Sequence, residues 1–504
     1  MVAHTWTVAF EGVDARPIDV QCAVAPGLPS FTIVGLPDKA VSEARERVRA
    51  ALSAMQIALP SKKITINLSP ADLPKAGSHF DLPVAIALLT AVGMIPEEVA
   101  ANTLSLGELA LDGSLVSVNG ALPAALAAAA QDCDLVCPAD CGAEAAWVGA
   151  AQVYAPASLA KLVRHFTGDA PLDTATAGEV SPATHTRDLR DIKGQEKAKR
   201  ALEIAAAGHH HMLMVGTPGS GKSMLAARLP TLLPELSPQE ALETSVIHSL
   251  AGLIEAGGIS RARPFREPHH TASMAAIVGG GRSAQPGEIA LAHNGVLFLD
   301  ELPEFSRGVL ESLRQPVETG EVMIARANAH MRYPTRFMLV AAANPCKCGY
   351  LPDPSRACAK VPICGEDYLG RISGPLMDRF DLRLDIPPVS FQDLHDAPRG
   401  EASATVAARV AKARDVQAAR YDGTHTRTNA ALEGGQLEQV ATPDAEGREM
   451  LRLAADKFGL SARGYHRVLR VARTIADLAG SETVRRPHVA EALSYRVVAA
   501  RESV

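Results

Sequence analysis

The hydrophobic and polar positions of the chain follow three different patterns. Residues 1–168 mix short apolar runs typical of strands, such as 64–68, with segments of helical spacing, such as 82–92. In residues 191–389, apolar strands end in glycine-rich or acidic turns and are followed by helices, the pattern of an α/β domain with a parallel sheet. From 390 to 504 the apolar residues repeat at helical spacing with few strand signals, which predicts a helical lid.

The segment 169–190 between the first two regions is rich in Asp, Thr, Ser, Pro and Gly and has no periodicity, so it reads as a linker. A length of 504 residues suits about three domains. With 47% apolar and 21% charged residues, a largely disordered chain is excluded. The longest nearly apolar run, 84–95, is shorter than the ~20 residues of a membrane span, and the N-terminus lacks the pattern of a secretory signal. We therefore expect a cytoplasmic protein without a membrane partner.

An apolar run at 212–215 leads into a glycine-rich loop and then a helical segment. Eight residues form the loop: Gly216, Thr217, Pro218, Gly219, Ser220, Gly221, Lys222 and Ser223. They match GxxxxGK[ST] between a strand and a helix, where glycines let consecutive backbone N–H groups surround a phosphate. In this motif Lys222 reaches the β- and γ-phosphates and the Ser223 hydroxyl ligates Mg²⁺. The loop predicts ATP and Mg²⁺ as cofactors.

A second polar cluster follows the apolar run 296–299. Asp300 at the end of this expected strand is suited to hold Mg²⁺ through water, and the adjacent Glu301 to orient or deprotonate the attacking water. Another expected strand, 337–343, ends in Asn344, whose amide can hydrogen-bond the γ-phosphate or the lytic water. These three side chains complete a predicted hydrolytic site.

Two arginines lie farther along the chain. Arg379 stands beside two aspartates in 374–381, a setting typical of a surface salt bridge. Its place at the far end of the expected α/β domain instead favours a finger that enters the site of a neighbouring subunit. Arg463 begins an amphipathic helix of the lid and is placed to contact the nucleotide of its own subunit.

Four cysteines, Cys346, Cys348, Cys358 and Cys364, lie between Asn344 and Arg379. Four thiolates at such short intervals suit a tetrahedral structural Zn²⁺. The Cys-x-Cys pair is tighter than the usual zinc-ligand spacing, so reduced loop thiols remain the alternative.

The stretch 261–270 combines three Arg, one Phe and two His, and is followed by the glycine-rich 279–282, which ends in Arg282. A loop of this kind predicts contacts to phosphates and bases in the pore of a ring; a solvated loop or a subunit contact is the alternative. The net charge of −6 excludes a uniformly basic nucleic-acid-binding surface but permits such a local patch. The tract 209–211, three histidines without an acidic or Cys partner in sequence, predicts a helix-to-strand turn rather than a metal site.

Further motifs complete a family pattern: Gly27-Leu-Pro29, Val34-Gly-Leu-Pro37, Pro268-His-His-Thr271, Pro286-Gly-Glu-Ile-Ala290 and Ser373-Gly-Pro-Leu-Met-Asp-Arg-Phe-Asp381. With them the chain resembles, over nearly its whole length, the ComM/YifB family of magnesium-chelatase-like AAA+ ATPases. The resemblance implies that Asn344 is sensor 1, Arg379 the arginine finger and Arg463 sensor 2. It also implies a homohexameric ring and, for ComM, an ATP-driven DNA motor that promotes branch migration as transforming DNA is integrated.

Residues 1–168 resemble, in the same way, an α+β domain of the Lon-protease type. The aligned nucleophile position holds His79 and the aligned base position holds Leu122. A Ser–Lys dyad needs a hydroxyl and an amine, so we expect no proteolysis.

The expected function is an ATP-driven hexameric motor on single-stranded or branched DNA, independent of base sequence. A magnesium-chelatase-type motor and a regulatory ATPase that remodels proteins are the alternatives, because the same loop, finger and lid would serve each. The Lon-like region favours the DNA motor.

Overall fold

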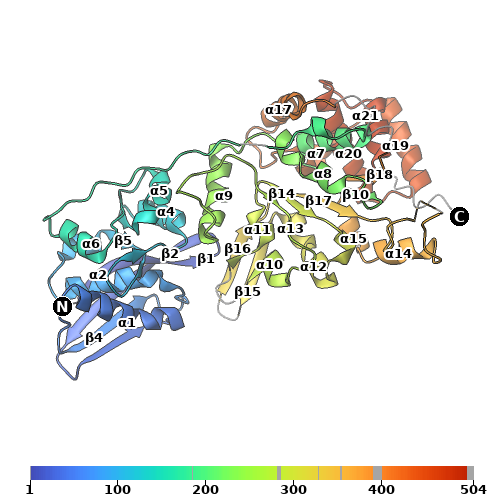
Figure 1. The fold of residues 1–504 in the computed structure, drawn as a ribbon. Helices are drawn as coiled ribbons and strands as arrows, with labels where there is room; N and C mark the ends of the chain where they lie inside the picture. The colour runs from blue at the N-terminus through green and yellow to red at the C-terminus, as the bar shows by residue number, and fades with distance from the viewer. Residues whose placement is uncertain are drawn as a thin grey trace.

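The computed structural model describes residues 2–183, 186–280, 285–326, 329–351, 353, 355–389 and 400–496. The chain forms an N-terminal α+β domain, an α/β domain and a C-terminal set of helices (Figure 1). Among the described residues, no helix is long and apolar enough to cross a membrane.

The N-terminal domain is built on a mixed sheet of seven strands in the order β3-β4-β2-β1-β5-β8-β9. Its strands are β1 (Val2–Glu11), β2 (Asp14–Ala25), β3 (Ser30–Val34), β4 (Lys63–Ser69), β5 (Thr103–Ser105), β8 (Asp134–Val136) and β9 (Val153–Tyr154). The helices of this domain are α1 (Lys39–Ala54), α2 (Asp81–Ala91), α3 (Glu97–Ala101), α4 (Ala121–Ala130), α5 (Ala139–Ala145) and α6 (Leu159–Phe166), and a small hairpin pairs β6 (Glu108–Leu109) with β7 (Leu115–Val116). Helix α2 is buried along nearly its whole length, which makes it the centre of this domain.

The two positions aligned with the Lon-type nucleophile and base, His79 and Leu122, are buried in this domain. Nε2 of His79 lies 2.9 Å from the carbonyl oxygen of Val8, and Leu122 is fully buried in the first turn of α4. The nearby Lys75 is buried too, and its ammonium donates to the Pro70 carbonyl. The absence of proteolytic activity in this domain stays a prediction.

The α/β domain holds a sheet of five strands in the order β11-β14-β17-β10-β18, and all neighbouring strands are parallel. Its strands are β10 (Met212–Gly216), β11 (Phe265–Arg266), β14 (Val296–Leu299), β17 (Met338–Ala343) and β18 (Leu382–Ile386). The α-helices are α7 (Glu196–Gly208), α8 (Lys222–Ala226), α9 (Pro238–Leu250), α10 (Met274–Val278), α11 (Glu288–Leu291), α12 (Arg307–Ser312), α13 (Arg314–Thr319), α14 (Ile363–Leu369) and α15 (Gly374–Met377). Short hairpins pair β12 (Gly279–Gly280) with β13 (Gln285–Pro286) and β15 (Glu321–Arg326) with β16 (Ala329–Pro334).

Both faces of this sheet are covered, which explains why its central strands are apolar at every position. Met212 and Met214 of β10 point into one hydrophobic cluster, and Leu213 and Val215 point into another. The first cluster also contains residues of α7 and of the C-terminal helices, while the second contains residues of α12.

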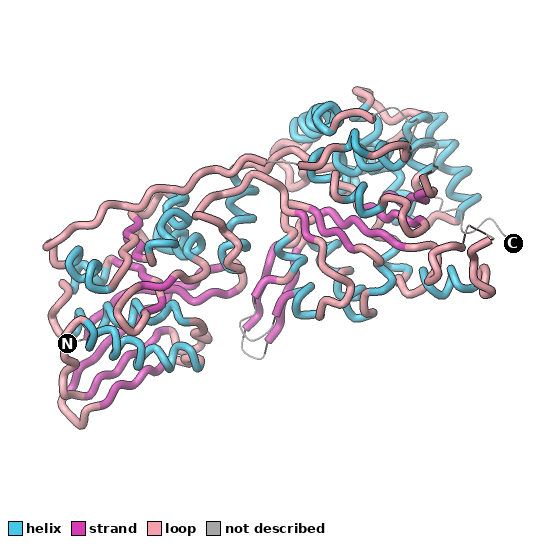
Figure 2. Tube along the Cα trace, in the orientation of Figure 1, coloured by secondary structure: helices cyan, strands magenta, loops and turns pink. Residues whose placement is uncertain are grey.

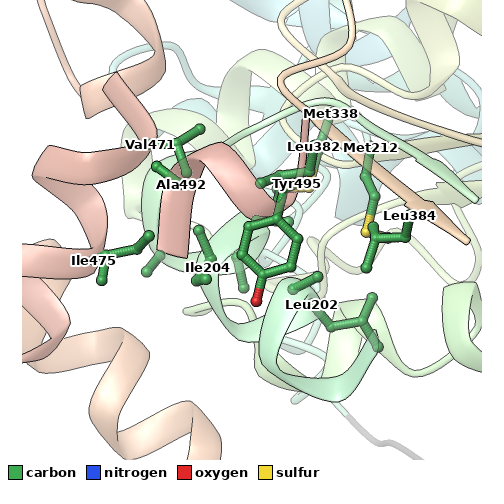
Figure 3. Packing of buried hydrophobic residues seen from close by; sticks show 14 of the residues in the cluster. Leu202, Ile204, Met212, Met338, Leu382, Leu384, Val471, Ile475, Ala492 and Tyr495 are labelled. Atoms are coloured by element: carbon green, nitrogen blue, oxygen red, sulfur yellow. The ribbon is translucent and has the colours of Figure 1, made fainter. Parts of the chain in front are cut away.

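The C-terminal helices are α17 (Ser403–Arg420), α18 (Gly434–Ala441), α19 (Ala445–Phe458), α20 (Ala462–Leu478) and α21 (Arg486–Ser494). Figure 3 shows how residues of α7, β18 and α20 pack with Tyr495, which follows α21. The helices and the sheet therefore share one hydrophobic core.

The N-terminal and α/β domains touch through α4, α5 and α9, which lie close together in Figure 1. Nε1 of Trp147 donates to the carbonyl of Gly257 at 2.8 Å, and the carboxylate of Glu144 accepts from the Ser249 hydroxyl. The predicted linker 169–190 runs along this junction mainly as loop (Figure 2), and short bridges pair Thr174 with Tyr154 and Ser181 with Ser260. Residues 184 and 185 of this linker, and the predicted start of the lid at 390, lie outside the described residues.

Candidate nucleotide site

The glycine-rich loop connects β10 to α8. Gly219 and Gly221 have φ values of +77° and +90°, which favour glycine, and a Cβ built at either would meet no atom within 4 Å. The loop is therefore open to solvent at these two positions. Gly216 is different, since a Cβ there would lie 2.4 Å from the carbonyl oxygen of Ile386.

Lys222 begins helix α8 with its ammonium folded back over the loop. Nζ donates to the carbonyl oxygens of Gly216 at 2.7 Å and Thr217 at 3.0 Å, and to Oδ1 of Asn344 at 3.2 Å. Burial lowers the pKa of Lys222, while the charges of Asp300 and Glu301 oppose this shift. A cation is thus held at the open loop by neutral oxygens that a phosphate can replace.

The acidic pair follows β14 on the same edge of the sheet. Oδ2 of Asp300 accepts a 2.7 Å hydrogen bond from the Ser223 hydroxyl, and its Oδ1 accepts from the backbone N–H of Glu301 at 2.9 Å. A hydroxyl and a carboxylate side by side are oxygen ligands of the kind that Mg²⁺ prefers, and the open loop leaves room for phosphates beside them. These residues fit a Mg²⁺–nucleotide complex.

The predicted residues Lys222, Ser223, Asp300, Glu301 and Asn344 therefore gather at the carboxyl ends of β10, β14 and β17, where parallel sheets bind their ligands.

Sequence reasoning missed two residues at this edge. Nδ1 of His270 lies 3.5 Å from Oε2 of Glu301, and burial together with the charge of Asp300 raises the pKa of Glu267. Both residues follow β11, which pairs in parallel with β14, so the chain after β11 arrives beside the acidic pair. Both residues belong to the stretch 261–270, for which the sequence predicts phosphate and base contacts; the pairing of β11 with β14 sets their place beside Glu301.

Glu301 itself has a left-handed backbone, with φ of +51°. Such a conformation costs a non-glycine residue free energy and persists where the surroundings enforce it. The turn points the half-exposed carboxylate toward His270.

The arginines Arg379 and Arg463 lie apart from the loop. Among the described residues, no hydrogen bond or ion pair joins either of them to the loop, Asp300 or Glu301. Arg379 is 6% exposed and its guanidinium donates to Glu318. Burial lowers its pKa, and the positive charges of Arg467 and Arg463 lower it further. Arg463 lies in the first turn of α20, next to the N-cap Ser461.

The four cysteine thiols approach one another. Sγ of Cys346 lies 3.1 Å from Sγ of Cys348, and hydrogen bonds from Cys346 first, then from backbone groups and Cys358, lower the pKa of Cys348 to about 7. Burial, with contributions from Cys358 and Cys346, raises the pKa of Cys364 to about 12. Two thiolates bound to one zinc lie ~3.8 Å apart, given bonds of about 2.3 Å. The thiols are thus closer than zinc would hold them, and within the described ranges no three His, Cys, Asp or Glu side chains form a metal-holding group.

The basic side chains of the stretch 261–270 make contacts within the α/β domain. Arg266 pairs with Glu288 through two hydrogen bonds of 2.6 and 2.7 Å, and Arg263 donates to the carbonyls of Pro234 and Asn294. Arg261 lies 3.3 Å from Glu235, while Phe265 stacks on Phe298 with ring centroids 6.1 Å apart. These contacts fix the surroundings of β11, and the expected contacts of this stretch to phosphates and bases stay a prediction. Arg282 of the same predicted loop lies outside the described residues.

The tract 209–211 forms the predicted helix-to-strand turn between α7 and β10, with His209 in a left-handed conformation. Nε2 of His210 lies 2.7 Å from Oγ1 of Thr474. Nδ1 of His211 accepts from the backbone N–H of Leu339 at 3.0 Å.

Comparison with family models covers most of the chain. Residues 188–394 match the model described as "Magnesium chelatase, subunit ChlI", and residues 400–496 match "Magnesium chelatase, subunit ChlI C-terminal". Residues 20–140 match "Subunit ChlI of Mg-chelatase".

Similar proteins extend the match to the full length. "Competence protein ComM" of Haemophilus influenzae is 44% identical over 505 residues, covering 99% of this chain and 98% of that protein. "Uncharacterized protein YifB" of Escherichia coli K12 is 44% identical, covering 98% and 96%. The "Magnesium-chelatase 38 kDa subunit" of Rhodobacter capsulatus is 25% identical, covering 61% of this chain and 86% of that protein. The chain therefore belongs to the ComM/YifB family of magnesium-chelatase-like AAA+ ATPases.

Proposed function

We propose that this protein hydrolyses ATP to drive movement on DNA. The observation that carries the ATPase part is the meeting of Lys222, Ser223, Asp300, Glu301 and Asn344 at one edge of the parallel sheet. In this proposal Ser223 and Asp300 hold Mg²⁺, which neutralises charge on the bound phosphates.

The remaining side chains divide the work of hydrolysis. Lys222 leaves the carbonyls of Gly216 and Thr217 and binds the β- and γ-phosphates. Glu301 orients the attacking water and accepts its proton, while Asn344 donates from its amide to the γ-phosphate or that water. His270, 3.5 Å from Glu301, positions the carboxylate.

The active form is a homohexameric ring in this proposal. Support comes from Arg379, which has no contact with its own loop among the described residues and is paired with Glu318 on the far side of the sheet from α7. A finger of this kind acts on the γ-phosphate of the adjacent subunit, and Arg463 acts as sensor 2 on the nucleotide of its own subunit.

The DNA part rests on likeness to the full-length relative named Competence protein ComM. The substrate is single-stranded or branched DNA, gripped through its phosphates and therefore without regard to base sequence. Such a motor works in the cytoplasm, where the DNA is. In this proposal the stretch 261–270 is part of the grip, and its Arg261 side chain is half-exposed.

A magnesium-chelatase-type motor is the second candidate, favoured by the family models that match all three regions. Against it, the magnesium-chelatase relative matches 61% of this chain at 25% identity, whereas ComM matches 99% at 44%.

ATPase assays with and without DNA test this function. Single-stranded, duplex and four-way-junction DNA are compared at several salt concentrations, and we expect stimulation that falls as salt rises. On a synthetic mobile junction, strand exchange should be faster with ATP than with ADP or no nucleotide. If ATPase activity is intact but ATP does not speed strand exchange, the DNA-motor proposal fails and the chelatase or protein-remodelling role is favoured.

A structural zinc at Cys346, Cys348, Cys358 and Cys364 is a finer proposal. It is supported by the mutual approach of these thiols and would require Cys346 and Cys348 to spread from 3.1 to ~3.8 Å.

A further inference from the structure

A buried polar cluster lies directly behind the finger residue. Asp381, two residues after Arg379, is 2% exposed and accepts at Oδ1 from Nη1 of Arg467 at 2.5 Å. Its Oδ2 accepts from the backbone N–H of His211 at 3.0 Å and lies 3.6 Å from Nδ1 of His210. One carboxylate thus ties together the helix-to-strand turn before β10, the start of β18 and helix α20.

Arg467 also holds the main chain of the finger residue. The same Nη1 atom donates to the carbonyl oxygen of Arg379 at 2.9 Å. Arg496, after α21, donates to the next carbonyl, that of Phe380, at 2.9 Å. The segment 379–381 is therefore fixed by two arginines of the C-terminal helices rather than by its own strand alone.

Arg467 lies one helical turn after Arg463 on α20, so the two side chains share one side of the helix. A change in the position of α20 that follows nucleotide contact at Arg463 must carry Arg467 with it. Burial makes the Arg467–Asp381 pair costly to break, because either charge left alone would be desolvated without a partner. Helix α20 and the segment 379–381 then move together.

We infer that Arg467 is a positioning residue that couples helix α20 to Arg379, so that the nucleotide state of one subunit sets how its finger is presented to the next. The inference rests on the proposed action of Arg379 across a subunit contact. The inference gives the buried Asp381 an indirect part in hydrolysis, because its carboxylate holds Arg467 and Arg467 holds the main chain of Arg379.

A subunit-mixing experiment tests this coupling. Subunit X carries Glu301→Gln and keeps its finger; subunit Y carries Arg379→Ala and keeps Glu301. Each alone should be nearly inactive, whereas mixed rings should recover ATPase activity wherever an X finger reaches a Y site. Arg467→Lys keeps the positive charge but replaces the planar guanidinium, whose Nη1 reaches both Asp381 and the Arg379 carbonyl, with an ammonium on a differently shaped side chain.

Arg467→Lys placed in X should lower the recovered activity about tenfold or more, because a slightly misplaced catalytic group loses most of its effect. Placed in Y, which has no finger, the same substitution should leave recovery within about twofold of the unmodified mixture. Arg473→Lys in X is the matched control: Arg473 is on the same helix, but its guanidinium donates to Asp477 and to the Glu482 carbonyl within the C-terminal helices.

Each outcome has a distinct meaning. Equal loss with Arg467→Lys in X and in Y would overturn the inference and leave a purely structural or same-subunit role. If the unmodified mixture of X and Y shows no recovery of ATPase activity, Arg379 does not act across subunits, and the inference fails with that proposal. Thermal melting of each variant checks that it folds. The isosteric Asp381→Asn is the second variant, and we expect it to lower the recovered ATPase activity when placed in X but not when placed in Y.

Discussion

The Ser223 hydroxyl donates a 2.7 Å hydrogen bond to the Asp300 carboxylate across 77 residues of sequence. This contact joins the glycine-rich loop to the strand that carries the acidic pair. The residues gathered there can be tested one by one.

Lys222→Ala and Glu301→Gln should fail at different steps. Without the ammonium, the β- and γ-phosphates lose their cation, so binding of a fluorescent ATP analogue and turnover should both collapse. Glu301→Gln should bind ATP like the parent but lower kcat by about 10²–10⁴, because the proton acceptor is gone. Parent-rate hydrolysis by Glu301→Gln would show that another group activates the water.

His270→Gln should lower kcat about tenfold with little change in KM, since the Glu301 carboxylate would lose its positioning partner but ATP contacts would remain. The neighbouring His269→Gln is the control, because His269 contacts the Thr271 hydroxyl at 2.8 Å and not Glu301. Steady-state kinetics of both variants decide the point; an equal effect of the two substitutions would argue for general loop damage.

ATPase activity should rise steeply with protein concentration, because a monomer offers Arg379 no γ-phosphate to reach. Arg379→Ala subunits should bind ATP and, when added to parent protein, should lower its activity by more than simple dilution. Light scattering with and without ATP follows assembly in parallel. A specific activity that is independent of concentration would contradict the ring.

Metal analysis of protein purified without chelator should find about one zinc per chain if the four thiols close on a metal. The variant Cys358→Ser/Cys364→Ser should lose that zinc, while Cys133→Ser, outside the cluster, should keep the parent content. Metal-free protein with normal ATPase activity would identify these residues as reduced loop thiols.

Stability should fall as pH drops below about 6.5, with His211 as one cause. Burial, above all, lowers the pKa of His211 from 6.5 to about 4, so the unfolded chain binds this proton more readily than the folded one. Protonation would also break the hydrogen bond that Nδ1 accepts from Leu339. The full effect is about 3 kcal/mol, lost between pH 6.5 and 4, and partial exposure of the ring reduces it.

Urea unfolding at pH 7.5, 6.0 and 5.0 measures this dependence. In His211→Gln the stability should decline less between these values than in the parent, because the proton-binding group is absent. An unchanged decline would assign the pH dependence to other groups.

The nucleotide loop and the acidic pair were predictable because their chemistry is local. A strand, a fixed spacing of glycines and a following helix determine where Lys222 lies, and one apolar run determines where Asp300 lies. The use of Arg266 was not predictable, since its partner Glu288 stands 22 residues away and only the fold brings them together. The position of His270 beside Glu301 was not predictable for the same reason, because it depends on the pairing of β11 with β14.

The Asp381–Arg467 pair shows more clearly which contacts cannot be predicted from a sequence. Its members are 86 residues apart, one just before β18 and the other on α20, and no periodicity links them. Charged residues at such positions look like solvated surface in a sequence. Burial of both, at 2% and 11% side-chain exposure, emerges only when α20 packs beside β18.

The shared core of sheet and C-terminal helices has a consequence for synthesis on the ribosome. Leu382 and Leu384 of β18 pack in one cluster with Ala492 and Tyr495, which are translated much later. While the intervening chain is being made, helix α7, without the C-terminal helices, covers only part of this apolar face of the new sheet. We expect this half of the protein to need a holding chaperone, or slow translation, until α21 has emerged.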